Sequence, residues 1–343
     1  MARSNIRVLA LDLDGTLTND EKIVTPRTRA ALDAAAAQGV TIVLASGRPT
    51  AGILPLAKEL GLDKKGGCVL AYNGGKIVDC VTGEALYQVQ LGAEFVPELC
   101  EFAARQDVAI LTYNSEGIVC ERDQDVWANK ECFTTKLPMI HVDDLASYVD
   151  YPICKMLITL DPARRDAVCA AGKEQFAGRI DLYPSSPFFI EAVPLGVAKD
   201  RSLAALMERM GLTRENLMAC GDGLNDRSMI SYAGVGVAMQ NAEDAVKAVA
   251  DSPDGHQHTE MAVGCFFQQQ KVERAAHDDK RRQHERHDFV QQRRAVDARR
   301  GGRKVWLPRR AGQAVLAQRA VSGIPTDLDM TVRTGIHFST SVA

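Results

Sequence analysis

The sequence lacks the features of a secreted, membrane-spanning or zinc-binding protein. Its nine cysteines form no CxxC pair and have no histidine-rich neighbours, so neither a disulfide framework nor a zinc site is indicated. No apolar run approaches the roughly 20 residues that a helix needs to cross a bilayer. The N-terminus also lacks the apolar stretch of a signal peptide. We therefore expect a cytoplasmic protein with no membrane partner.

The charged residues are unevenly distributed along the chain. Residues 252–343 contain 16 lysines and arginines against 10 aspartates and glutamates, whereas residues 1–251 contain 25 against 34. The basic segment also holds six of the seven histidines and shows little helical or strand periodicity. The remaining 251 residues are enough for two folded domains. We expect residues 252–343 to be an atypical, irregular tail.

Apolar runs and helix signals alternate along the first eighty residues. Strands are expected at 6–11, 41–45 and 68–72, and helices that start near Pro26 and Pro49 separate them. Strands separated by helices of this length form right-handed βαβ units and a parallel sheet. The same alternation returns in the third quarter of the chain.

The stretch between these two parts has a mixed character. Residues 83–192 combine hairpin-like strands with a few helices, and they interrupt the βαβ series. The sequence therefore predicts a discontinuous α/β core domain made of residues 1–82 and 193–251. Residues 83–192 are expected to form an inserted α+β domain.

Two aspartates follow the first apolar run. Side chains alternate along a strand, so Asp12 and Asp14 point to one face while Leu13 packs on the other. Neighbouring carboxylates repel each other unless something offsets their charge. A hard divalent cation such as Mg²⁺ prefers oxygen ligands of this kind and also binds substrate phosphate. An acidic turn at the surface is the plainer interpretation of the pair taken alone.

Three further segments carry residues suited to phosphate chemistry. Ser46 and Gly47 follow an expected strand, where a hydroxyl and free backbone N–H groups can hold a phosphate. Lys199 lies at an expected helix start, where a lysine is usually only solvated. The loop 221–226, with the sequence GDGLND, also follows a strand. Ligands of open α/β sheets bind at this end of the strands.

Taken in order, DLDGT, Ser-Gly-Arg, a long insertion, Lys and GDGLND resemble the haloacid dehalogenase (HAD) superfamily of phosphotransferases. The segments 72–75 (YNGG), 185–191 (SSPFFIE) and 236–242 (GVAMQNA) resemble its Cof-like branch, class IIB. The resemblance covers about residues 5–251. It implies an α/β fold with a Rossmann-like parallel-sheet core and an inserted α+β cap domain of the C2 type.

The resemblance implies a role for each residue of the reaction. Asp12 would be the nucleophile that attacks phosphorus and becomes an aspartyl-phosphate. Asp14 would be the general acid for the leaving oxygen and then the base for the hydrolytic water. Ser46, Gly47 and Lys199 would hold the phosphoryl oxygens and neutralise their charge.

The resemblance also implies a metal site. Asp12, the main-chain carbonyl of Asp14, and Asp222 would bind Mg²⁺ directly, and Asp226 would support the site from behind. Asn225 would orient Lys199 or the phosphate.

These roles imply a Mg²⁺-dependent phosphatase of small phosphorylated metabolites, with sugar phosphates as the leading substrate class. Phosphatases of flavin mononucleotide or pyridoxal phosphate, and phosphomutases, are alternatives from the same family. A nucleic-acid-binding protein acting through the basic tail is the non-enzyme alternative, since lysine and arginine clusters neutralise phosphates. The tail has no recognisable binding motif, so nucleic acid is the less favoured partner.

The tail departs from the Cof-like pattern directly after Asp251. The pattern continues with Tyr-Val-Thr, whereas this chain continues with Ser-Pro-Asp-Gly-His-Gln-His. The codons TCA CCT GAC GGC CAC CAA CAC encode these residues, and loss of the second nucleotide gives Tyr-Leu-Thr-Ala-Thr-Asn. Our hypothesis is that the reading frame shifts at residue 252. Independent DNA reads that show an unbroken frame there would refute it.

Overall fold

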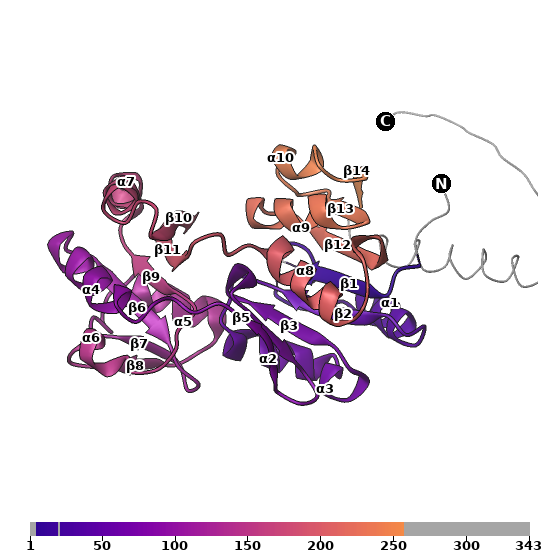
Figure 1. The fold of residues 1–343 in the computed structure, drawn as a ribbon, viewed down its shortest axis with the longest axis horizontal. Coiled ribbons are helices and arrows are strands. Elements are labelled where there is room, and N and C mark those ends of the chain that lie inside the picture. The colour runs from indigo at the N-terminus through magenta and orange to yellow at the C-terminus, as the bar shows by residue number, and fades with distance from the viewer. Residues whose placement is uncertain (1–4, 20, 257–343) are drawn as a thin grey trace, which may run out of the picture. The chain divides into compact units, whose positions relative to one another are not determined.

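The computed structural model describes residues 5–19 and 21–256, which form two β-sheets with helices packed against them (Figure 1). The strand order of the first sheet is β14-β13-β12-β1-β2-β3-β4-β5. In this order its strands are β14 (Ser252–His256), β13 (Val235–Met239), β12 (Leu217–Gly221), β1 (Val8–Asp12), β2 (Thr41–Ala45), β3 (Cys68–Ala71), β4 (Lys76–Asp79) and β5 (Ala85–Gln88).

Neighbouring strands of the first sheet are parallel from β14 to β3, and β4 and β5 add an antiparallel hairpin at the edge. The helices of this part are α1 (Pro26–Ala36), α2 (Thr50–Glu59), α3 (Leu62–Lys65), α8 (Lys199–Arg209), α9 (Arg227–Tyr232) and α10 (Asp244–Lys247). Short 3₁₀ turns are η1 (Tyr72–Gly74), η3 (Arg214–Asn216) and η4 (Leu224–Asp226). The predicted α/β fold with a parallel-sheet core is confirmed.

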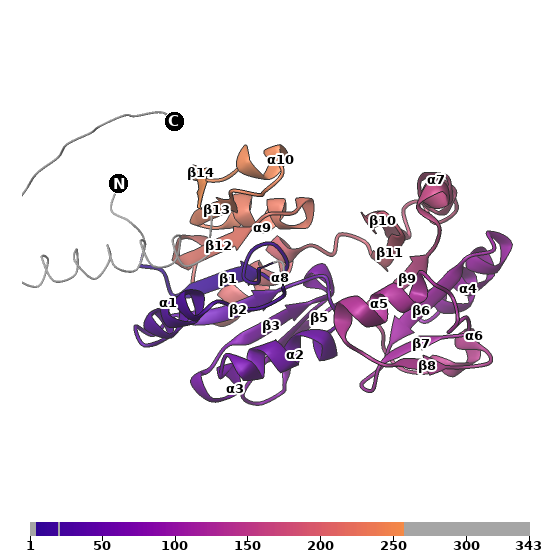
Figure 2. The same ribbon diagram turned by 180° about the vertical axis from the view of Figure 1, so that it is seen from behind.

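Helices cover both faces of the first sheet because its central strands are apolar on both sides. Leu9 of β1 packs in one buried cluster with Leu32 of α1. Val8, one residue earlier, points to the opposite face and packs with Leu203 of α8. Figure 1 shows α8 in front of the strands. Figure 2, which views the protein from the opposite side, shows α1 in front of them.

The second sheet lies between the two parts of the first in sequence. Its order is β10-β11-β9-β6-β7-β8, and only β7 and β8 pair in parallel. Its strands are β10 (Ile180–Ser186), β11 (Phe189–Pro194), β9 (Met156–Thr159), β6 (Ala109–Tyr113), β7 (Ile118–Cys120) and β8 (Met139–His141). Its helices are α4 (Phe95–Arg105), α5 (Ala128–Thr135), α6 (Leu145–Tyr148) and α7 (Arg165–Gln175), with the 3₁₀ turn η2 (Pro162–Arg164).

Two boundaries differ from those expected. Strand β5 pairs with β4 in the first sheet, so that sheet continues past residue 82, and β11 extends the second sheet to Pro194. At the start of the predicted tail, Ser252–His256 pairs with β13 as β14. The rest of the predicted tail, residues 257–343, lies outside the described residues.

Within the described part of the chain, no helix could span a membrane. The predicted cytoplasmic location stays a prediction.

Candidate active site

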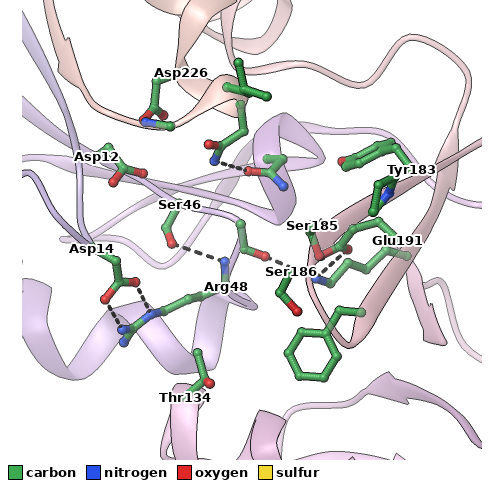
Figure 3. Close-up of a pocket in the computed structure, with 18 of the residues that line it drawn as sticks. Asp12, Asp14, Ser46, Arg48, Thr134, Tyr183, Ser185, Ser186, Glu191 and Asp226 are labelled. Carbon is green, nitrogen blue, oxygen red and sulfur yellow. Dashed lines mark hydrogen bonds and ion pairs between the residues drawn. The ribbon is translucent and has the colours of Figure 1, made fainter. Parts of the chain in front are cut away.

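Four segments that are distant in sequence meet at the carboxyl ends of the central strands. Asp12 ends β1, Ser46 follows β2, and Asp222 follows β12, which are three neighbouring parallel strands. Lys199 is the first residue of α8. Figure 3 shows Asp12, Ser46 and Asp226 at one end of the pocket. The predicted convergence of these segments therefore holds in the structure.

Lys199 is the buried cation of this site. Its Nζ donates to Oδ1 of Asp12 at 2.7 Å, to Oδ1 of Asp226 at 2.6 Å, and to the carbonyl oxygen of Ala45 at 3.0 Å. Its side chain is fully buried. Burial opposes the charged form, but the charges of Asp12 and Asp226 outweigh it and raise the pKa of Lys199. The ammonium group is thus held charged and has a fixed position.

Three carboxylates form an acidic cluster here, and two of them, Asp12 and Asp226, contact the ammonium group. One oxygen atom each of Asp12, Asp222 and Asp226 lies within 4.8 Å of the other two. When ionised they exceed the charge of Lys199 by two negative charges. Burial, with help from the neighbouring acids, raises the pKa of Asp12 to about 8 and also raises the pKa of Asp222. A divalent cation with oxygen ligands fits this excess charge and this donor set.

The three acids are not equivalent. Oδ1 of Asp226 accepts from Lys199, and its Oδ2 accepts from the backbone N–H groups of Asp222 and Gly223 at 3.0 Å each. Both of its oxygens therefore have protein donors, as expected of a residue that supports a metal site from behind.

Asp222 is held by two residues that the sequence analysis did not assign. Thr16 Oγ1 donates to Asp222 Oδ1 at 2.8 Å, and Asn241 Nδ2 donates to Asp222 Oδ2 at 3.0 Å. Asn241 Nδ2 also donates to the carbonyl oxygen of Gly15 at 3.0 Å. Gly15 has φ +88°, and a Cβ there would lie 2.4 Å from Asp222 Oδ2, so only glycine allows this approach. Thr16 belongs to the motif DLDGT and Asn241 to the motif GVAMQNA, so these two motifs could have identified both residues.

The Asp14 side chain lies outside the acidic cluster. Arg48 binds it in a bidentate manner, with Nε to Oδ2 at 3.0 Å and Nη2 to Oδ1 at 2.7 Å (Figure 3). Lys22 Nζ lies 2.9 Å from Oδ1. Burial favours the neutral acid, but the hydrogen bond from Lys22 and the charge of Arg48 hold the pKa of Asp14 below its ordinary value. Proton donation by Asp14 therefore requires release from both cations.

The segment after β2 forms a short loop that lines the cavity. Ser46 is buried, and its Oγ accepts from the backbone N–H of Arg48 at 3.2 Å. Gly47 lies beside Asn73, and a Cβ on Gly47 would lie 2.9 Å from Asn73 Nδ2. Asn225 Nδ2 donates to Oδ1 of Asn73 at 3.0 Å. Its role in orienting Lys199 or the phosphate stays a prediction.

A cavity of about 940 Å³ opens over these residues. One wall comes from the first sheet and contains Asp12, Asp14, Ser46 and Asp222. The other wall comes from the second sheet and its helices. Its residues include Glu131, Thr134, Lys155, Arg165, Tyr183, Pro184, Ser185, Ser186, Pro187, Phe188, Phe189 and Glu191. A ligand held at Asp12 would therefore contact the inserted segment with its other end.

Comparison with known proteins gives consistent matches. Residues 9–260 match the sequence profile of the haloacid dehalogenase-like hydrolases. The putative phosphatase M6_Spy0533 of Streptococcus pyogenes is 31% identical over 248 residues, 72% of this chain and 91% of that protein. The pyridoxal phosphate phosphatase YbhA of Escherichia coli is 29% identical, over 76% of this chain and 97% of that protein. A haloacid dehalogenase-like hydrolase from Bacteroides thetaiotaomicron, known from a crystal structure, has 41% sequence identity to this chain and a TM-score of 0.73. The match covers 76% of this chain and 100% of the crystallised chain.

Proposed function

Because this chain belongs to the haloacid dehalogenase-like hydrolases and is a phosphatase of small phosphorylated substrates, we propose that it is a Mg²⁺-dependent enzyme acting through an aspartyl-phosphate. Sugar phosphates are the leading substrate class. The observation that carries the proposal is the position of Asp12, which lies against Lys199 and within one acidic cluster with Asp222, at the floor of a cavity.

We propose the following first step. An Asp12 carboxylate oxygen forms a bond to phosphorus, and the bond between phosphorus and the leaving oxygen breaks. Asp14, released from Arg48 and Lys22 and protonated, gives its proton to that oxygen. The Ser46 hydroxyl and the Lys199 ammonium hold the phosphoryl oxygens, where negative charge concentrates in the transition state.

In the second step Asp14 takes a proton from water, whose oxygen forms a bond to phosphorus while the bond to Asp12 breaks. Inorganic phosphate leaves, and both aspartates return to their starting states. Mg²⁺, held by Asp12 and Asp222 with Asp226 behind them, would neutralise charge on the phosphoryl group. Lys199, which donates to Asp12 Oδ1, favours the ionised form of Asp12 that attack requires, against the effect of burial.

We further propose that residues 89–194 are the cap domain. They carry the second sheet and one wall of the cavity, so they would exclude water and select the leaving group. This range starts after β5 and ends with β11.

Two alternatives share most of this chemistry. A phosphomutase would use the same first step but return the phosphoryl group to the substrate. Pyridoxal phosphate and flavin mononucleotide are alternative substrates, and the name of the relative YbhA supports the former. Nucleic acid remains the less favoured partner.

A phosphate-release screen tests the proposal. Sugar phosphates, pyridoxal phosphate and flavin mononucleotide are each incubated with the enzyme, with Mg²⁺ or with a chelator. We expect inorganic phosphate to appear from at least one sugar phosphate, and the rate to fall at least about 100-fold without metal. Asp12→Asn prepared in parallel controls for contaminating phosphatases. Turnover that a chelator leaves unchanged would contradict the Mg²⁺ site, and transfer without phosphate release would favour the mutase.

A further inference from the structure

A buried ion pair in the inserted segment faces the phosphate-binding side of the cavity. Lys155 directly precedes β9, and its Nζ lies 2.7 Å from Oε2 of Glu191 on β11. The two side chains are only 3% and 6% exposed. Lys155 Nζ also lies 5.3 Å from the centre of the Tyr113 ring. Burying an ammonium group is costly unless its hydrogens find partners, so each contact of Lys155 stabilises its position.

One contact of Lys155 reaches the other sheet. Its Nζ donates to the carbonyl oxygen of Gly47 at 3.2 Å, and this carbonyl lies directly after Ser46. The same peptide unit carries the N–H of Arg48, which donates to Ser46 Oγ at 3.2 Å. Because the peptide is planar, holding its carbonyl fixes the direction of its N–H. Lys155 thereby influences the Ser46 hydroxyl without touching it.

The occupied lone pair of Ser46 Oγ has a chemical consequence. A hydroxyl group has one hydrogen to donate and two lone pairs to accept. When the N–H of Arg48 donates to this oxygen, the hydroxyl hydrogen of Ser46 is left to be donated to a phosphoryl oxygen. A rotated Gly47–Arg48 peptide would remove that N–H, and the hydroxyl could then turn elsewhere.

The loop that carries Ser46 is also held through Asn73. Asn73 accepts at Oδ1 from Asn225 Nδ2 at 3.0 Å, and it lines the cavity together with Tyr183 of β10. The backbone N–H of Asn73 donates to the carbonyl oxygen of Ser46 at 3.0 Å. Figure 3 shows Tyr183 and Glu191 across the pocket from Ser46. The loop is therefore held from the inserted segment through the Gly47 carbonyl and from the first sheet through Asn73.

We propose that Lys155 is a positioning residue that couples the seating of the inserted segment to phosphoryl binding at Ser46 and Gly47. This inference rests on the proposed function. Lys155 acts through the Gly47 carbonyl, so its effect depends on the phosphoryl group and is the same for every leaving group. A residue that instead recognised the leaving group would affect some substrates and spare others, and it would not alter the affinity for free phosphate.

Two variants separate the Gly47 contact from the ion pair. Glu191→Gln removes the charge of the partner but leaves Lys155 to donate to Gly47. Lys155→Met in the Glu191→Gln background removes the donor without leaving an unpaired buried carboxylate. The readouts are the inhibition constant of inorganic phosphate, and kcat and KM for two substrates with different leaving groups. Circular dichroism and thermal unfolding check that both variants are folded.

We expect the double variant to raise the inhibition constant of phosphate about 10- to 100-fold, as a small misplacement of binding groups can. Its kcat/KM should fall by one similar factor for both substrates. Glu191→Gln should lose clearly less than the double variant, because Lys155 can still donate to Gly47, and Lys155→Arg should recover part of the loss, because it keeps a donor. An unchanged inhibition constant, a loss that differs between the substrates, or equal losses in the single and double variants would each overturn the proposal.

Failure of the proposed phosphatase function would give different results from failure of the proposed role of Lys155. In that case the parent protein releases phosphate from no substrate, and binding of inorganic phosphate with Mg²⁺ is measured by calorimetry instead. Weaker phosphate binding by the double variant than by Glu191→Gln would still support the role of Lys155. Equal binding by the two would refute that role.

Discussion

Replacing Asp12 with asparagine is expected to lower turnover at least about 10⁴-fold, because a carboxamide oxygen does not attack phosphorus at a useful rate. The substitution conserves shape, and the amide oxygen can still accept from Lys199 Nζ, which lies 2.7 Å from Asp12 in the parent. The fold and part of the Mg²⁺-dependent phosphate binding should therefore survive. Phosphate release under saturating substrate measures the loss, and circular dichroism checks the fold.

A matched control uses an aspartate away from the site. Asp33 on α1 pairs with Lys65 at 2.7 Å at the protein surface. Asp33→Asn should leave kcat/KM within about twofold, since exposed pairs contribute little to stability. If Asp12→Asn kept more than about one hundredth of the parent activity, Asp12 would not be the nucleophile.

Replacing Lys199 with methionine is expected to lower the free energy of unfolding by about 3–5 kcal/mol, the typical cost of breaking a buried ion pair from one side. The substitution leaves three neighbouring carboxylates with no ammonium group among them. Turnover should also fall, since a phosphoryl-binding charge is lost. Urea unfolding in the presence of a chelator measures the destabilisation.

The control for this change is Lys65→Met, which removes a lysine from the exposed pair with Asp33. Its cost should be no more than about 1 kcal/mol. Mg²⁺ should restore part of the stability of Lys199→Met, because the cation offsets the same carboxylates. Equal losses in the two variants would mean that the acidic cluster around Lys199 is not compensated as we describe.

The central sheet and the meeting of its loops could be predicted from the sequence. Apolar runs that end in Asp12, Ser46 and Asp222 mark strands, and parallel strands place their carboxyl ends at one edge. Adding Lys199 required the resemblance, because a lysine at a helix start is usually solvated. Its burial follows from contacts with residues 187 and 27 positions away, Asp12 and Asp226.

The partners of individual side chains could not be predicted in the same way. Asn241 reaches Gly15 over 226 positions, and Arg48 reaches Asp14 over 34. Such pairs depend on how loops fold across the sheet, which no local periodicity encodes. The contact of Asn225 with Asn73, 152 positions away, is another such pair.

Local sequence patterns also could not predict which strands form the edges of the first sheet. The predicted boundary at residue 82 falls between β4 and β5, and only the pairing of β5 with β4 and of β4 with β3 assigns both strands to the first sheet. At the other edge, β14 forms from residues without strand periodicity, because β13 offers it a row of backbone partners.

Trapping the covalent intermediate tests the central claim most directly. A substrate labelled with ³²P in its phosphoryl group is mixed with the enzyme and Mg²⁺, quenched in acid within milliseconds, and reduced with borohydride. We predict that the label is bound to protein before reduction, and that reduction converts residue 12 to homoserine. Phosphate release without any labelled protein, or homoserine at another position, would contradict the account.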